Sequence, residues 1–200
     1  MSRGRTAGAF VLWLVGLGAN AGAQNLVANG DFDTGLESWT LGSMAAFTWN
    51  PADWQGNPAS GSGRHTNQAP CAGTSVRQCL VLPLPLAASY ELGAAVSFQG
   101  GPGMGSATVW ATTYEGTSCA GVGTASFLGP ASTVPGQWDS FLTPGLELPE
   151  STGAVAIDLV VTKPFVPGCP GLPTISALFD HVRFGPTGTT PVALESFAIE

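Results

Sequence analysis

The stretch that decides the fold is Asn25-Leu-Val-Ala-Asn29-Gly30-Asp31-Phe32-Asp33-Thr-Gly35-Leu-Glu37-Ser-Trp39. Its counterpart near the other end of the chain is Phe179-Asp180-His181-Val182-Arg183-Phe184. Both combine aspartates with large apolar side chains. Most of the chain lies between these two stretches.

Residues 1–23 have the pattern of a secretory signal peptide. Arg3 and Arg5 precede an apolar run over 7–17, and 21–23 read Ala-Gly-Ala, small residues that suit signal cleavage. The alternative is a retained membrane anchor, but a span needs roughly 20 apolar residues. We expect a folded domain over 24–184, a linker and short tail over 185–200, and no membrane insertion of the mature chain. The protein would be secreted or at the cell surface, with the periplasm also open.

Composition excludes some partners and favours a globular β domain. Six Lys and Arg face thirteen Asp and Glu, a net charge of −7. No basic stripe is available to neutralise phosphates, so nucleic-acid binding is not expected. Charged residues are only 10%, while 44% are hydrophobic with six Trp and ten Phe, a content that disordered chains lack.

The four cysteines indicate disulfides. All lie after the signal peptide, and an even count in an exported protein is typical of paired thiols. Three pairings are possible. The short spacing favours Cys71–Cys79, which leaves Cys119–Cys169. Zinc is the alternative, but the sequence has no Cys-x-x-Cys pair or histidine cluster.

Short segments with period-two alternation predict an all-β sandwich or barrel. In residues 90–98, Tyr90, Leu92 and Phe98 share one face, and the small residues Gly93 and Ala95 lie on the other. Further strands are predicted over 76–82, 105–114, 138–142, 154–162 and 178–184. No stretch shows a sustained helical period free of glycine and proline.

The two end stretches, residues 25–39 and 179–184, resemble the first and last strands of a secreted bacterial jelly-roll domain of the carbohydrate-binding-module (galactose-binding-like) type. In that family an Asn-Gly-x-Phe-Glu/Asp opening followed by Trp pairs with a closing Phe-Asp-x-Val strand. Similar motifs follow in order at residues 53–62, 76–79, 90–92, 117–121 and 135–138. The resemblance implies a jelly-roll β-sandwich of two antiparallel sheets.

The resemblance also implies a structural calcium ion that ties the chain ends together. Asp33 occupies the family's acidic position and Asp180 lies on the last strand, with Asp31 close by. Carboxylate oxygens suit calcium. Strict alternation places Asp180 on one face with Val182 and Phe184. Alternatively, Asp31 and Asp33 only end a strand by accepting hydrogen bonds from local backbone amides, as Asp does in turns.

Aromatic residues beside polar ones are the candidates for ligand binding, because a sugar ring stacks on an aromatic face while polar groups take its hydroxyls. Trp110 and Tyr114 share one strand face, although such a face is often the large-residue side of a core. The other candidates are Trp54, Asp53 and Gln99.

Nothing in the sequence indicates catalysis. There are only two histidines, His65 and His181, and no Gly-x-Ser-x-Gly or His-Glu-x-x-His motif. The leading prediction is therefore a non-catalytic module that binds a cell-wall, matrix or environmental glycan, with a polysaccharide as partner. The alternative is a structural or surface-interaction protein that serves adhesion or assembly without a sugar site.

Overall fold

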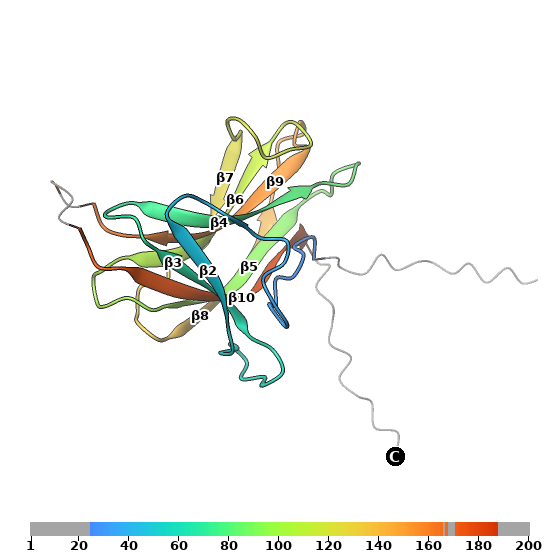
Figure 1. The fold of residues 1–200 in the computed structure, drawn as a ribbon. Helices are drawn as coiled ribbons and strands as arrows, with labels where there is room; N and C mark the ends of the chain where they lie inside the picture. The colour runs from blue at the N-terminus through green and yellow to red at the C-terminus, as the bar shows by residue number, and fades with distance from the viewer. Residues whose placement is uncertain (1–24, 166, 168–170, 188–200) are drawn as a thin grey trace, which may run out of the picture.

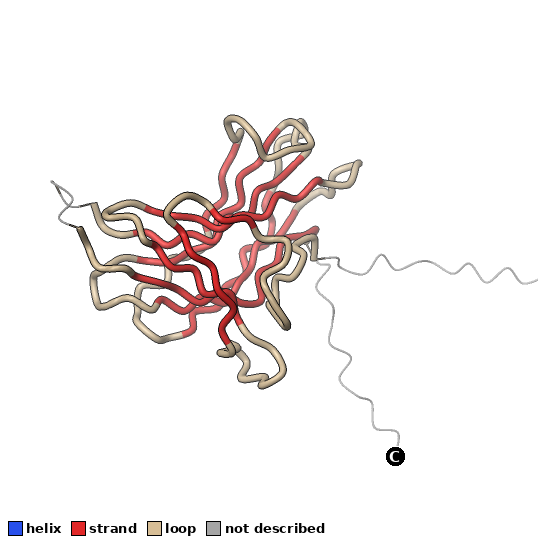
Figure 2. The backbone as a smooth tube through the Cα atoms, viewed as in Figure 1, coloured by secondary structure: helices blue, strands red, loops and turns tan. Residues whose placement is uncertain are grey.

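The computed structural model describes residues 25–165, 167 and 171–187 and contains ten strands in two sheets (Figures 1 and 2). The strands are β1 (Thr40–Leu41), β2 (Ala45–Asn50), β3 (Ser62–Asn67), β4 (Gly73–Val81), β5 (Tyr90–Phe98), β6 (Ser106–Tyr114), β7 (Ala125–Leu128), β8 (Trp138–Leu146), β9 (Ala154–Thr162) and β10 (Ile175–Pro186). One five-stranded sheet has the order β1-β4-β9-β6-β7 and the other β2-β3-β10-β5-β8. We call them the β9 sheet and the β10 sheet, after their central strands.

Every pairing between the described strands is antiparallel. The predicted all-β jelly-roll sandwich is therefore confirmed. The predicted strands over 90–98 and 154–162 have the observed bounds of β5 and β9, and four others overlap β4, β6, β8 and β10. The short strands β1, β2, β3 and β7 were not predicted.

The core lies between the sheets. From the β10 sheet it receives the alternate residues of β5 that include Leu92 and Phe98, together with Phe179 and Phe184 of β10. From the β9 sheet it receives the alternate residues of β6 and β9, of which Val109 is fully buried. Tyr90 stacks on Phe184 with ring centroids 5.3 Å apart. Alternation thus decides which face of each strand remains for function.

The prediction of a first strand over residues 25–39 is wrong, although its contact with the last strand is real. This segment is a series of turns and bends, because Asn29 and Phe32 have φ angles of 51° and 47°, which a strand does not allow. It nevertheless runs beside β10. Leu26 N donates to Phe184 O at 2.8 Å, and Val182 N donates to Gly30 O at 2.9 Å.

The predicted face of Asp180 is also wrong. The pairing of β10 with β5 shifts register between Asp180 and Arg183, and His181 has a φ of 51°. A bulge of this kind adds one residue and reverses the alternation. Val182 and Phe184 therefore enter the core, whereas Asp180 and Arg183 both lie on the outer face of the β10 sheet.

Both predicted disulfides are wrong, because Cys79 pairs with Cys119. Cys71–Cys79 cannot form, since residues 73–81 are the extended strand β4 and a strand rises about 3.3 Å per residue. The Cα atoms of a disulfide are only about 5.5–6 Å apart. Cys119–Cys169 is excluded by the Cys79 bond. Cys71 is also disulfide-bonded, and Cys169 lies outside the described residues.

A disulfide indicates folding in an oxidising compartment, which agrees with export. The predicted signal peptide (1–23) and most of the predicted tail (185–200) lie outside the described residues. In the ranges that the structure covers, no helix is long and apolar enough to cross a membrane.

Candidate functional site

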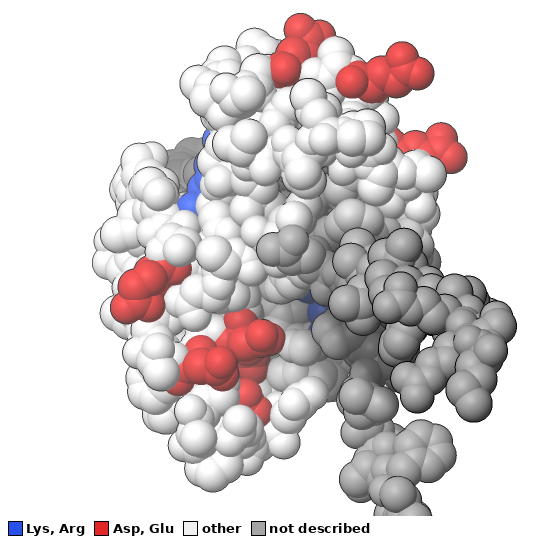
Figure 3. Space-filling model, turned by 90° about the vertical axis from the view of Figure 1, so that its right-hand side faces the viewer, with Lys and Arg blue, Asp and Glu red and all other residues white. Residues whose placement is uncertain are grey.

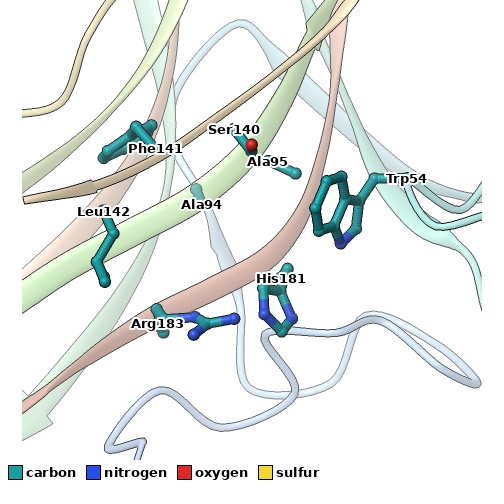
Figure 4. A pocket seen from close by; sticks show the side chains of 8 residues that line it. All are labelled: Trp54, Ala94, Ala95, Ser140, Phe141, Leu142, His181 and Arg183. Carbon is teal, nitrogen blue, oxygen red and sulfur yellow. The ribbon is translucent and has the colours of Figure 1, made fainter. Parts of the chain in front are cut away.

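A hollow of about 260 Å³ lies on the outer face of the β10 sheet (Figure 4). Strands β5, β8 and β10 and the loop between β2 and β3 supply its walls. Its lining residues are Trp54, Ala94, Ala95, Ser140, Phe141, Leu142, His181 and Arg183. The lining thus combines an indole, aliphatic groups and several hydrogen-bond donors.

Small residues of β5 form the floor of the hollow. Gly93 and Ala95 are consecutive outward-facing positions of that strand, and they pair with Leu142 and Ser140 of β8. A Cβ atom on Gly93 would lie 3.0 Å from Cγ of Arg183 and 3.0 Å from Cδ1 of Leu142. The absence of a side chain therefore lets both neighbours pack over Gly93, and the lining residues of β5 are the adjacent Ala94 and Ala95.

The loop between β2 and β3 holds Trp54 as one wall of the hollow. Oδ1 of Asp53 accepts hydrogen bonds from the backbone N of Gln55 and of Asn57, each at 2.8 Å, which is an Asx-type turn. The backbone N of Trp54 donates to Oδ2 of Asp180 at 3.0 Å. The loop is therefore tied both to itself and to the central strand of the sheet.

The ionisable side chains in and around the hollow are Arg183, His181, Asp31, Asp53 and Asp180. Nδ1 of His181 lies 2.7 Å from Oδ1 of Asp31, and this hydrogen bond lowers the pKa of Asp31. Asp180 is 1% exposed, and burial raises its pKa to about 7, with the charges of Asp53 and Asp31 adding to the effect. Asp180 is thus only partly ionised at neutral pH.

The three carboxylates predicted to hold calcium have other partners. Asp31 is paired with His181, Asp33 accepts from Oγ of Ser60 at 2.7 Å, and Asp180 accepts from two backbone amides. Among the described residues, no group of three or more His, Cys, Asp or Glu is arranged to hold a metal ion. The residues as placed do not fit a calcium site, and calcium binding stays a prediction.

Three of the predicted ligand residues, Trp54, Asp53 and Gln99, do not all lie together in the structure. Trp54 lines the hollow, and Asp53 shapes the loop that carries it. Gln99 follows the end of β5, where its Nε2 donates to Oγ of Ser97 at 2.9 Å, and it is not part of the lining.

Trp110 and Tyr114 lie on the other sheet, on the outward face of β6. Tyr114 is 5% exposed and packs with Ala154, Ala156 and Cys119. Trp110 is half-buried, and its strand neighbours are Asp158 of β9 and Leu128 of β7. Only Trp110 of this pair has enough exposed surface for a ligand ring.

Sequence reasoning missed Ser140, Leu142, His181 and Arg183 as lining residues. A signal for the floor was present, because β5 alternates large residues with Gly93, Ala95 and Ser97, and small outward residues leave space above a sheet. No comparable signal existed for His181 and Arg183, whose placement depends on the bulge in β10.

One face of the molecule is shown by charge in Figure 3. In the view of Figure 3 most described residues are uncharged, Asp and Glu form separate groups, and little Lys or Arg is visible. This face provides no basic stripe, in agreement with the net charge of −7.

Solved structures with a similar fold include carbohydrate-binding modules. A xylan-binding domain from carbohydrate-binding module family 22 superposes with a TM-score of 0.60 at 18% identity, covering 86% of this chain and 98% of that one. TmCBM61, solved in complex with β-1,4-galactotriose, gives 0.53 at 14% identity, covering 80% and 97%.

A third similar structure is the enzymatically active domain of bacteriophage CBA120 tailspike protein 4, with a TM-score of 0.55 at 13% identity. The match covers 80% of this chain but only 21% of the tailspike chain. No protein-family model matches the sequence, and no curated protein does. The predicted resemblance is therefore confirmed as a likeness of fold.

Proposed function

We propose that this protein is an exported, non-catalytic module that binds a glycan in the hollow of the β10 sheet. The observation that carries the proposal is the position of Trp54, which stands as a preformed wall above a floor of small residues and faces hydrogen-bond donors. An aromatic wall beside convergent polar groups is what a sugar requires, because the apolar face of the ring stacks and its hydroxyls need partners.

The chemistry of the lining suits a sugar unit of a longer chain. The exposed Leu142 offers apolar surface opposite Trp54, and Ser140 and Arg183 offer polar groups between them (Figure 4). Because the loop of Trp54 is already anchored to Asp180, little conformational entropy has to be lost on binding. The similar structures whose names describe xylan binding or a galactotriose complex lend support at the level of fold.

A hydrolytic role is less well supported by the same hollow. His181 and Asp31 form the pair that orients a general base in many hydrolases. Ser140 lines the hollow too, but no hydrogen bond joins it to His181 in the part of the chain that the structure describes. A nucleophile has to lie within hydrogen-bond reach of its base, and we therefore propose binding without reaction.

Affinity electrophoresis against a panel of soluble polysaccharides tests this function. We expect at least one glycan to retard the protein, and Trp54→Ala to abolish the retardation. Trp110→Ala is the matched control, because it removes an indole from the opposite sheet. If only Trp110→Ala abolishes retardation, the site lies on the β9 sheet. Retardation by no glycan would refute the proposal in favour of a structural or adhesive role.

A further inference from the structure

Arg183 places a positive charge in the hollow. Its stem lies over Gly93, and its guanidinium extends along the rim towards His181 (Figure 4). Among the described residues, the guanidinium of Arg183 makes no hydrogen bond and no ion pair, whereas Arg77 is bound in bidentate fashion to Asp158 at 2.8 Å. The five N–H donors of Arg183 thus remain available for a ligand.

The nearby acids are already engaged by other groups. Asp31 accepts from His181, and the two oxygens of Asp180 accept from the backbone N of Trp54 and of His181. Asp53 accepts from two amides of its own loop. The pKa of Asp31 is lowered mainly by its hydrogen bond with His181 and further by the charge of Arg183, which acts on this carboxylate without forming an ion pair with it.

We infer that the hollow takes a sugar bearing a carboxylate, a uronic acid unit, with the carboxylate on Arg183 and the ring against Trp54. This inference rests on the proposed function. The planar fork of a guanidinium matches a carboxylate with two parallel hydrogen bonds, which are stronger than bonds to a neutral hydroxyl. An arginine beside an indole therefore selects an acidic sugar over its neutral analogue.

The charge of the whole protein makes this preference easy to distinguish from nonspecific attraction. A net charge of −7 repels a polyanion at long range, and nonspecific binding of polyanions needs a basic surface. Any preference of this chain for an acidic glycan must therefore come from a local contact.

The test is isothermal titration calorimetry of the full chain with three acidic polysaccharides, a galacturonan, a glucuronan and an alginate. Each is paired with the same polymer after its carboxylates have been reduced to alcohols. We expect one acidic polymer to bind about ten- to a hundred-fold more tightly than its reduced partner, as one charge-assisted bidentate contact provides. Arg183→Gln should remove this difference and leave the weaker binding of the reduced polymer.

Two control variants test whether the preference depends on the planar guanidinium of Arg183 and on its position in the hollow. Arg183→Lys keeps the charge but loses the planar fork, and should retain only part of the preference. Arg64→Gln removes an exposed charge from the same sheet, outside the hollow, and should leave the preference unchanged. Equal or tighter binding of the reduced polymer in every pair would overturn the inference while leaving the proposed function intact. Binding of no polymer, acidic or reduced, would overturn the inference, and the proposed function would then be decided by the polysaccharide panel alone.

Discussion

The buried imidazole of His65 gives the sharpest prediction about stability. His65 is fully buried between the sheets, where its Nε2 lies 3.0 Å from Oγ1 of Thr74. Burial lowers its pKa to about 4 from a usual value of 6.5 and outweighs a backbone hydrogen bond with Leu159, which acts in the opposite direction. In the unfolded chain the ring takes up a proton below pH 6.5, while in the folded chain it does so only below about pH 4.

The magnitude follows from proton linkage. Between pH 6.5 and 4 the unfolded state holds one more proton than the folded state, so the free energy of unfolding falls by about 1.4 kcal/mol for each unit of falling pH. Over the window this amounts to about 3 kcal/mol. Above pH 6.5 the imidazole is neutral in both states and contributes no slope.

Asp180 acts in the opposite direction over nearly the same window. Its pKa is raised from 3.8 to about 7, so between these values the folded state holds the extra proton and stability falls as pH rises. The two slopes have similar size and opposite sign. We therefore expect the stability of the wild-type protein to change little between pH 4 and 6.5, because two buried groups compensate each other.

Urea unfolding followed by tryptophan fluorescence, with chelator present, measures these slopes. His65→Leu should lose about 3 kcal/mol as pH rises from 4 to 6.5, and Asp180→Asn should gain a similar amount over the same range. The change with pH is the measure, since the loss of a hydrogen bond to Thr74 costs the same at every pH. A His65→Leu profile parallel to that of the wild type would refute the reasoning.

Three further predictions concern the disulfide, the ion pair and calcium. Replacing Cys79 and Cys119 by serine opens a link between residues 40 positions apart and should lower the free energy of unfolding by about 4 kcal/mol, whereas a loss below about 1 kcal/mol would contradict the chain-entropy account. Arg77→Ala leaves Asp158 buried without its partner and should cost about 2–3 kcal/mol, less than a fully buried pair because the Arg77 side chain is 40% exposed. In the same unfolding assay, leucine at both positions should recover most of this loss, and no recovery would argue against an electrostatic cause. If calcium ties the chain ends together, chelator should lower the melting temperature of the wild type but not that of Asp180→Asn, and an unchanged wild-type melt would exclude the ion.

The sandwich could be predicted from sequence because its long strands alternate strictly. Tyr90–Phe98 and Ala154–Thr162 place large apolar residues on one face, and a buried face enforces that register. The short strands β2 and β3 have weaker patterns, since Phe47 and Trp49 are followed by a polar loop, and His65 occupies a core position that its residue type does not indicate. These elements form through long-range pairing, which local propensity does not record.

The site could be predicted only in part, because it is assembled from distant segments. The polar surroundings of Trp54 predict a binding residue, but Trp54 is held as a wall of the hollow by the hydrogen bond from its backbone N to Asp180, 126 positions away in the sequence. Arg183 could not be assigned, since counting alternate residues through a bulge gives the opposite face. The predicted disulfide Cys71–Cys79 is wrong for a related reason, because the segment between these cysteines is extended and residues close in sequence are therefore far apart in space.

The bulge at His181 has a consequence for how this strand can change. An extra residue in a pleated strand reverses the alternation, so that every side chain after it lies on the opposite face of the sheet. Deleting residue 181 would turn Val182 and Phe184 out to solvent and direct Arg183 into the core. The hollow and the part of the core formed by residues after 181 therefore depend on the same bulge. A residue inserted into or deleted from β10 at this position would change both of them.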